Sequence, residues 1–292
     1  MPSPRPQVSE RTSQIRRVLI GLLVTNLLVV AAKLGIGLFS GSLAVVGDAM
    51  HSGVDALNNV LALVVMRVAA QAPDEDHPYG HGKFETLGAL AIVGFLSITS
   101  FELVRQAVNR LAGAHRPPLL SALQFLALLG TLAVYVVVAR FERRRGEQLG
   151  SQLLVADAAH TRADVFITMG VVIGLLLARR GWWWADPALA VVIALLIVRV
   201  AFQIVNQAIP VLVDQRAIHA TTIQRTAEAV DGVKGAYAIR SRGGAPVRYA
   251  EVTIAVDKDA NVAAAHAIAD EVEGRLKRDL QLDEVTVHVE PC

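Results

Sequence analysis

The chain contains the same acid–histidine–acid pattern, D-x-x-H-x-x-x-D, in two separate apolar segments. The pattern occurs at Asp48, His51 and Asp55 and again at Asp157, His160 and Asp164. Offsets of three and seven residues place the three side chains of each set on one stripe of an α-helix. Two such helices facing each other can offer two imidazoles and two carboxylates to one ion, a ligand set that suits Zn²⁺ and related divalent metals. We therefore expect a four-ligand metal site at His51, Asp55, His160 and Asp164.

The two remaining acids, Asp48 and Asp157, precede each histidine by about one helical turn. They are placed to accept the second N–H group of the histidine or to line the route of the metal. The alternative is that both helices are simply polar and hydrogen-bond to each other for packing. Ionisable groups inside a membrane span are costly and normally functional, so the repetition of the pattern favours ion handling.

A second group of acids and histidines lies between these segments, in a stretch at residues 73–82 that is rich in Pro, Asp, His and Gly. Its members are Asp74, Glu75, Asp76, His77 and His81, followed by Lys83. Taken alone, an acidic loop with two histidines is more often a solvated loop than a metal site. Both interpretations stay open on the residues alone.

Composition points to a helical membrane protein. Of the 292 residues, 53% are hydrophobic and only 18% are charged, which excludes a disordered chain and argues against an ordinary soluble enzyme. The net charge of +2 leaves no strongly basic surface for nucleic acid. A single cysteine, Cys292, excludes an intramolecular disulfide and a cysteine-rich metal site.

Six apolar stretches are long enough to cross the ~30 Å hydrocarbon core of a bilayer as helices. They cover residues 18–39, 42–69, 84–111, 119–141, 152–178 and 187–212. Six spans place both termini on one side. The excess of Arg and Lys in the N-terminal tail and in the second and fourth loops predicts that this side is the cytoplasm. We expect a disordered tail at residues 1–15 and a transmembrane domain at residues 16–214.

After about residue 215 the sequence has the pattern of a soluble domain. A short polar helix at 222–230 precedes alternating stretches at 233–242 and 248–256, a helix at 263–280 and a third alternating stretch at 284–290. A period of two indicates strands and a period of 3.6 indicates helices, so the predicted order is αββαβ. The predicted fold is an α-helical membrane protein with a small α+β, ferredoxin-like cytoplasmic domain at residues 215–292.

In combination, these motifs resemble the cation diffusion facilitator family. The resemblance rests on D-A-M-H-S-G-V-D in the second span, H-P-Y-G-H-G-K-F-E after it and H-T-R-A-D in the fifth. It covers nearly the whole chain after the tail. It implies a homodimeric antiporter in the inner (plasma) membrane, with both termini cytoplasmic, that exports Zn²⁺ in exchange for protons. Cd²⁺, Co²⁺ and Fe²⁺ are further candidate substrates.

The resemblance also implies roles for individual residues. It assigns His51, Asp55, His160 and Asp164 to the intramembrane transport site, and Asp74, His77 and His81 to a second metal site in the loop. It further implies that Lys83 and Asp214 form a charged pair that interlocks helices near the dimer axis.

The soluble domain matches the family less completely. His266, His288 and Glu290 align with metal-ligand positions of the family, whereas Tyr237 and Thr253 stand where histidine can occur. The expectation is therefore a site that holds one ion, binds weakly or has only a structural role.

Two other functions are an intramembrane metalloenzyme and a metal-gated channel or sensor. A catalytic zinc ion usually has three protein ligands and an open position, whereas this pattern offers four, and no separate general base is visible. An enzyme is therefore not expected. Other polar residues of the spans could line a water-filled cavity or bond between helices: Asn26, Lys33, Asn58, Asn59, Glu102 and Asn206.

Overall fold

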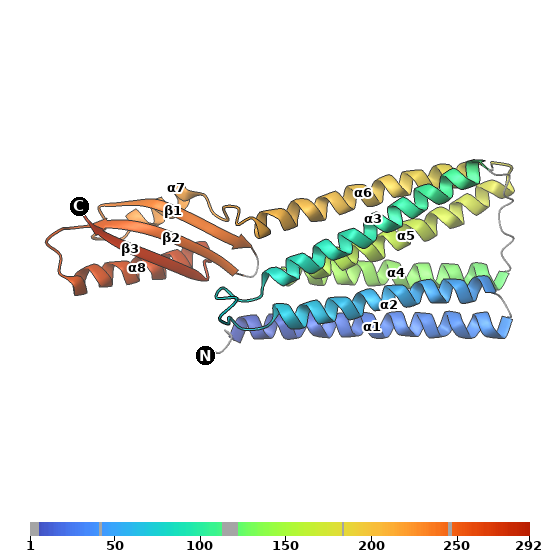
Figure 1. Ribbon diagram of the computed structural model, residues 1–292, viewed down its shortest axis with the longest axis horizontal. Helices are drawn as coiled ribbons and strands as arrows, with labels where there is room; N and C mark the ends of the chain where they lie inside the picture. The colour runs from blue at the N-terminus through green and yellow to red at the C-terminus, as the bar shows by residue number, and fades with distance from the viewer. Residues whose placement is uncertain (1–5, 41–42, 113–121, 183, 245–246) are drawn as a thin grey trace. The chain divides into compact units, whose positions relative to one another are not determined.

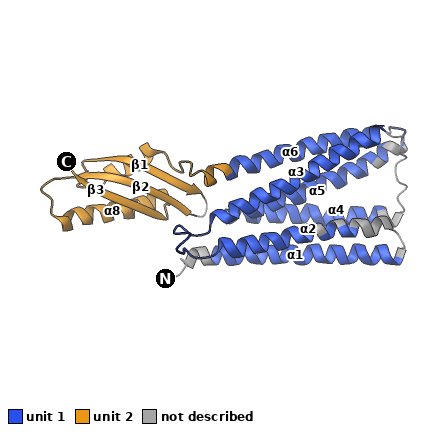
Figure 2. Ribbon diagram, in the orientation of Figure 1, with its two compact units in different colours: residues 1–208 blue, residues 209–292 orange. Residues whose placement is uncertain are grey.

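The structure is a computed structural model that describes residues 6–40, 43–112, 122–182, 184–244 and 247–292. The chain divides into two compact units, residues 1–208 and residues 209–292, and each unit has its own hydrophobic core (Figure 2). The division falls a few residues before the predicted boundary between residues 214 and 215.

The first unit is a bundle of long helices (Figure 1). The helices are α1 (Pro6–Ser40), α2 (Leu43–Ala69), α3 (Lys83–Ala112), α4 (Ala122–Gln148), α5 (Gln152–Arg179) and α6 (Ala185–Leu212), the last turn of α6 belonging to the second unit. Within the described residues, three helices are long and apolar enough to cross a membrane: α1 over Glu10–Phe39, α3 over Lys83–Ala112 and α6 over Ala185–Leu212. The unit is thus a helical membrane domain with three clear apolar spans.

Large apolar side chains lie on the outside of this bundle as well as inside it. Leu38, Phe101 and Leu195 are between 65% and 70% exposed. Exposed apolar area of this kind is a liability in water but is favourable against lipid. Small residues allow the helices to approach closely: a Cβ added to Gly170 of α5 would lie 2.2 Å from the Cδ1 atom of Ile193 of α6.

α1 begins at Pro6, inside the segment for which the sequence predicts a disordered tail. Its early turns have buried partners. Ile15 is fully buried, and Arg11 donates hydrogen bonds from Nη1 and Nη2 to Glu85 Oε2, at 3.1 Å each. The Nε atom of Arg11 donates to the carbonyl of Leu149 at 2.7 Å, and Ser151 Oγ donates to Glu85 Oε1 at 2.6 Å. This network joins α1 to the start of α3 and to the turn between α4 and α5, which explains why the helix starts early.

The second unit has the element order that the sequence predicts. It contains α7 (Ala220–Glu228), β1 (Gly235–Gly244), β2 (Val247–Val256), α8 (Val262–Leu280) and β3 (Glu284–Pro291). The sheet order is β1-β2-β3, with β1 antiparallel and β3 parallel to β2. Asn261 caps α8 by accepting from the backbone N–H of Ala264 at 2.8 Å. α8 buries Val272 and Leu276 in a core shared with Ile254 of the sheet.

Candidate metal sites

Three of the four predicted transport ligands come together inside the first unit. Asp55 of α2 and His160 and Asp164 of α5 each offer a ligand atom within 4.8 Å of the others. His160 Nε2 is 3.6 Å from Asp55 Oδ1 and 3.9 Å from Asp164 Oδ2, and the three side chains are between 10% and 13% exposed. His51 precedes Asp55 by about one turn of α2, but its side chain and that of Asp48 lie outside the described residues.

The positions of these side chains follow from helix geometry. His160 and Asp164 are four residues apart, so they project from the same face of α5 towards α2. Two buried carboxylates beside one imidazole are stable only when a positive charge offsets them, because burying unpaired charge is costly. A divalent cation, or a proton on His160, supplies that charge.

Asn58 is a neighbour of this cluster whose role the sequence left open. Its amide Nδ2 lies 3.2 Å from His160 Nε2, and the side chain is 8% exposed. When His160 Nε2 accepts this amide hydrogen, the imidazole is neutral, and the bond occupies the single lone pair of Nε2. A metal ion, which also requires the neutral imidazole, would therefore have to displace Asn58 from this atom. Asn58 is three residues after Asp55, on the same stripe of α2, and this spacing is the signal from which the contact could be predicted.

A second pair of buried acids lies one turn away, between α4 and α5. Asp157 is 3% exposed and its carboxyl group lies close to that of Glu142, which is 1% exposed. Thr161 Oγ1 lies within hydrogen-bond distance of Glu142 Oε2, at 3.2 Å. Two carboxylates are both acceptors, so this contact requires a proton or a cation between them. The sequence pattern predicts no role for Glu142, because this residue stands in a run of charged residues at the end of an apolar stretch.

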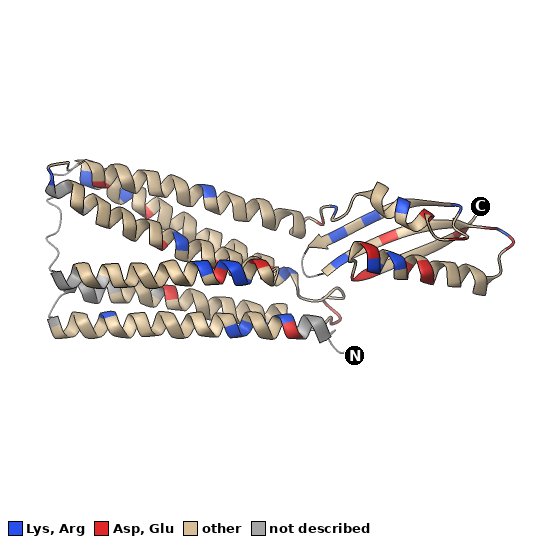
Figure 3. Ribbon diagram, turned by 180° about the vertical axis from the view of Figure 1, so that it is seen from behind, with Lys and Arg blue, Asp and Glu red and all other residues tan. Residues whose placement is uncertain are grey.

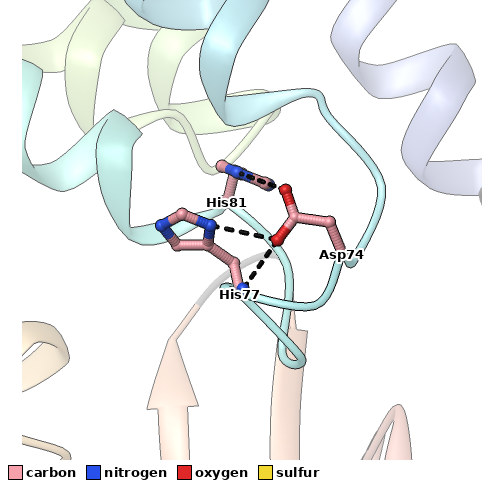
Figure 4. A group of neighbouring side chains, drawn as sticks. All are labelled: Asp74, His77 and His81. Carbon is pink, nitrogen blue, oxygen red and sulfur yellow. Dashed lines mark hydrogen bonds and ion pairs between the residues drawn. The ribbon is translucent and has the colours of Figure 1, made fainter.

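The predicted loop site is also assembled (Figure 4). Asp74, His77 and His81 lie between α2 and α3, with ligand atoms within 4.8 Å of one another. Asp74 Oδ1 is 3.1 Å from His77 Nδ1, and Asp74 Oδ2 is 3.5 Å from His81 Nε2. The two imidazole rings are 4.2 Å apart, and Phe84 stacks against His81. One carboxylate and two imidazoles in this arrangement suit a borderline divalent metal.

Backbone geometry holds the loop in this form. Asp74 Oδ1 accepts the backbone N–H of His77 at 2.6 Å, and this bond holds the pKa of the Asp74 carboxyl below its usual range. The backbone N–H of Gly80 donates to the carbonyl of His77 at 2.8 Å, in a turn where Gly80 has a φ of 81°. A glycine adopts this left-handed conformation without steric cost. His81 is 5% exposed, and its Nδ1 atom has no hydrogen-bond partner among the described residues.

The predicted charged pair consists of one residue from each unit. Lys83 is the first residue of α3. Asp214 belongs to the second unit, where its Oδ1 atom is 3.6 Å from Arg242 Nη1. The pairing of Lys83 with Asp214 stays a prediction.

In the second unit, three strands bring the candidate ligands of the sheet side by side. Tyr237 is opposite Thr253, and Thr253 is opposite His288. His288 Nε2 lies 3.5 Å from Glu290 Oε1, and the Tyr237 hydroxyl donates a short hydrogen bond to Glu290 Oε2. This bond to a carboxylate raises the pKa of the Tyr237 phenol. Tyr237 therefore occupies one carboxylate oxygen of Glu290, the acid that is predicted to bind a metal ion.

His266 lies on α8, where its Nδ1 atom is 3.5 Å from Asp270 Oδ1. The groups of at least three converging ligands found among the described residues are the cluster in the helices and the cluster in the loop. The three-ligand site at His266, His288 and Glu290 stays a prediction.

Comparison with known proteins finds similarity along both units. The model of the cation efflux transmembrane domain matches residues 19–213, and that of the cation efflux protein cytoplasmic domain matches residues 216–292. The manganese efflux system protein MneS of Bacillus subtilis is 30% identical over 288 residues, covering 97% of this chain and 98% of that protein. The cation-efflux pump FieF of Shewanella oneidensis is 30% identical over 273 residues, covering 91% and 90%.

Proposed function

Because the chain belongs to the cation diffusion facilitator family of metal efflux transporters, we propose that it exports Zn²⁺ from the cytoplasm in exchange for protons. The family consists of transporters rather than enzymes, so the chain is not an enzyme. Metal efflux is the general function of the family, whereas the choice of zinc and the coupling to protons are our proposals.

The observation that carries the proposal is the buried cluster of Asp55, His160 and Asp164. It lies within a membrane domain, where ionisable groups are retained for ion pathways. We place His51 as the fourth ligand, because it precedes Asp55 by about one turn of the same helix. Four ligands of this kind, two imidazoles and two carboxylates, provide a tetrahedral site that removes the hydration shell of the ion.

The same side chains couple metal movement to proton movement. A metal binds the neutral imidazole and the ionised carboxylates, so protons and metal compete for His160, Asp55 and Asp164. Metal loads from a cytoplasm of higher pH, and exposure to a more acidic exterior protonates the ligands and expels the ion. The metal site faces the cytoplasm and the exterior in turn, as one group of helices rocks against another around the fixed site.

We propose that α1 to α6 all cross the membrane, with both termini in the cytoplasm. Three of these helices satisfy the length and hydropathy of a span on their own, and the other three have similar lengths of 27 or 28 residues. The second unit then lies in the cytoplasm, and we propose that two copies of the chain form a homodimer in the inner (plasma) membrane. The match to the cytoplasmic domain of the family, over residues 216–292, supports this placement.

Manganese is the main competing substrate. The relative MneS is described as a manganese efflux protein, and Mn²⁺ prefers oxygen ligands such as the carboxylates of Asp55 and Asp164. Imidazole nitrogen favours zinc and other borderline metals, and two of the four proposed ligands are histidines. We therefore propose Zn²⁺ as the preferred ion, with Cd²⁺, Co²⁺ and Fe²⁺ ahead of Mn²⁺.

A competition experiment tests this proposal. Purified protein is reconstituted in vesicles with an enclosed zinc-sensitive dye, and uptake of Zn²⁺ is measured with increasing Mn²⁺ or Cd²⁺ outside. We expect Cd²⁺ to inhibit zinc uptake more strongly than equimolar Mn²⁺ does. Stronger inhibition by Mn²⁺, together with faster Mn²⁺ uptake in its own assay, would show that the chain is a manganese exporter.

We also propose that the loop cluster of Asp74, His77 and His81 binds Zn²⁺ on the cytoplasmic side. It supplies three ligands close to the start of α3 and remains accessible, since Asp74 is about half exposed. The C-terminal residues His288 and Glu290 form a weaker candidate, because Tyr237 already bonds to Glu290.

A further inference from the structure

A cavity of about 470 Å³ opens between α4, α5 and α6, away from the metal ligands. The residues of α5 that line it include Ala158, Arg162 and Met169. At 100° per residue, these positions lie on the face of α5 opposite to His160 and Asp164. The transport function as proposed makes no use of this cavity.

One end of the cavity is basic. Arg140 and Arg143 of α4 and Arg162 of α5 line it, and no acidic residue is among the described lining residues. The Nε atom of Arg162 is buried and has no hydrogen-bond partner in the described part of the chain. Arg143 Nε donates to Glu147 at 2.8 Å, on an exposed surface. Figure 3 shows basic residues close together along the C-terminal part of α4.

Arg143 and Arg162 belong to neighbouring helices and line the same cavity. A guanidinium group has five N–H donors and binds phosphate or carboxylate in a bidentate manner. Arg140 and Arg162, for which no ion pair is found within the described residues, are therefore suited to bind an anion in the cavity, next to Arg143, which also pairs with Glu147.

The part of the cavity on the far side of the arginines from the α4–α5 turn is lined by apolar residues. Val136 precedes the two arginines of α4 by one to two turns, and Phe166 and Met169 follow Arg162 by a similar distance. α4 and α5 run in opposite directions, because a short turn connects them. The apolar residues of both helices, with Val200 of α6, therefore lie at the same end.

We propose that this cavity binds an anionic phospholipid, with its phosphate at the three arginines and part of an acyl chain along the apolar end. Arg140 and Arg143 stand where the apolar stretch of α4 ends, which is the depth of the lipid headgroups in a membrane-spanning helix. A soluble phosphate would account for the basic end but not for the apolar one. The inference rests on α4, α5 and α6 lying in the bilayer, and it is independent of which metal is transported.

Native mass spectrometry of the purified full-length protein tests the inference. The protein is stripped of lipid and titrated with phosphatidylglycerol or with phosphatidylcholine of the same acyl chains. We expect the anionic lipid to bind more tightly. Arg162→Gln and Arg140→Gln should each weaken phosphatidylglycerol binding by about fivefold. They should weaken phosphatidylcholine binding less, because that lipid carries the same phosphate but no net negative charge. Arg144→Gln, which removes a neighbouring exposed arginine that does not line the cavity, is the matched control and should bind like the wild type.

Three results would overturn the inference. The first is equal affinity for the two lipids. The second is an equal loss in Arg144→Gln, which would indicate a general effect of surface charge. The third is displacement of the lipid by glycerol phosphate at similar concentration, which would indicate a site for a soluble anion. Because Arg140 is exposed, its variant also reports on the site if Arg162→Gln is poorly folded. Zinc uptake measured on the same variants separates a failure of this inference from a failure of the proposed function.

Discussion

His160 is the residue for which a metal ion and a proton compete. Its Nε2 atom is within 4 Å of both Asp55 and Asp164 and 3.2 Å from the amide of Asn58. A neutral imidazole can accept from the amide or bind a metal, whereas a protonated one can only donate to the two carboxylates. Occupation by metal and protonation are therefore alternatives at the same atom.

We expect Asp164→Ala and Asp55→Ala to reduce zinc uptake to the level of empty vesicles while the protein remains folded. Each variant removes a charged ligand, and the ligands that remain neither neutralise nor enclose a divalent ion. Zinc uptake into inside-out vesicles measures the effect. Glu102→Gln, which removes an exposed carboxylate of α3, is the control and should transport normally. Normal uptake in either aspartate variant would exclude it from the transport site.

We expect His160→Asp to move the preference of the transporter from Zn²⁺ towards Mn²⁺. The change replaces a nitrogen ligand by an oxygen ligand, which manganese prefers. An increase of about tenfold in the ratio of manganese to zinc uptake corresponds to ~1.4 kcal/mol of changed ligand preference. An unchanged ratio, in a variant that still transports, would show that this nitrogen does not set the selectivity.

At the level of single residues, the sequence predicts the ligands better than their neighbours. The grouping of Asp55, His160 and Asp164 follows from offsets along two helices, which are local quantities. The contact of Glu142 with Asp157 does not, because it depends on how far α4 extends past its apolar stretch and on its packing against α5. Asn58 carried the correct spacing, but the packing of α2 on α5 decides whether it lines a cavity or bonds to a ligand.

The elements that position the sites are two helices and one loop. α2 and α5 are regular helices that hold the buried cluster from facing surfaces. The loop between α2 and α3 has no regular structure, so it relies on the bond from the His77 backbone to Asp74 and on the turn at Gly80. The positions of the helices and the αββαβ order followed from hydrophobic periodicity. The early start of α1 did not, because it depends on tertiary contacts of Arg11.

We expect Gly80→Ala to weaken zinc binding by the loop. A Cβ at this position would meet Pro73 only at ordinary contact distances of 3.7 Å, so the cost comes from the φ of 81° and amounts to about 1–2 kcal/mol. Calorimetric titration of the full chain measures it, in a background where Asp164→Ala removes transport-site binding. Gly82→Ala, where an added Cβ meets nothing within 4 Å and φ is not positive, is the matched control. Equal affinities in both variants would show that the turn does not hold the site.

We expect Tyr237→Phe to strengthen zinc binding by the second unit. The change frees Glu290 from its hydrogen bond to the phenol, so both carboxylate oxygens become available to a metal ion. Because the folded state raises the pKa of Tyr237, the stability that this bond gives is present below the ordinary phenol pKa and is lost as pH rises through the raised value. The test is zinc titration of residues 209–292, a unit with its own core. Weaker binding in Tyr237→Phe would instead make the phenol oxygen a ligand.

The whole molecule combines a membrane domain that holds the buried cluster with a second unit that carries its own core. The family match covers both, at residues 19–213 and 216–292. A metal-gated channel would pass ions down their gradient without moving protons in return. An antiporter must exchange metal ions for protons, because the same buried side chains bind either a metal ion or protons. Proton counterflow is therefore the property that separates the two.

The most direct test of the account is simultaneous measurement of zinc and protons in vesicles that contain the full chain and separate dyes for each. Zinc added outside should enter while protons leave, and an acidic vesicle interior should drive zinc uptake against its concentration gradient. Both effects should disappear in Asp164→Ala. Zinc entry that is insensitive to the pH gradient and is accompanied by no proton release would contradict the account.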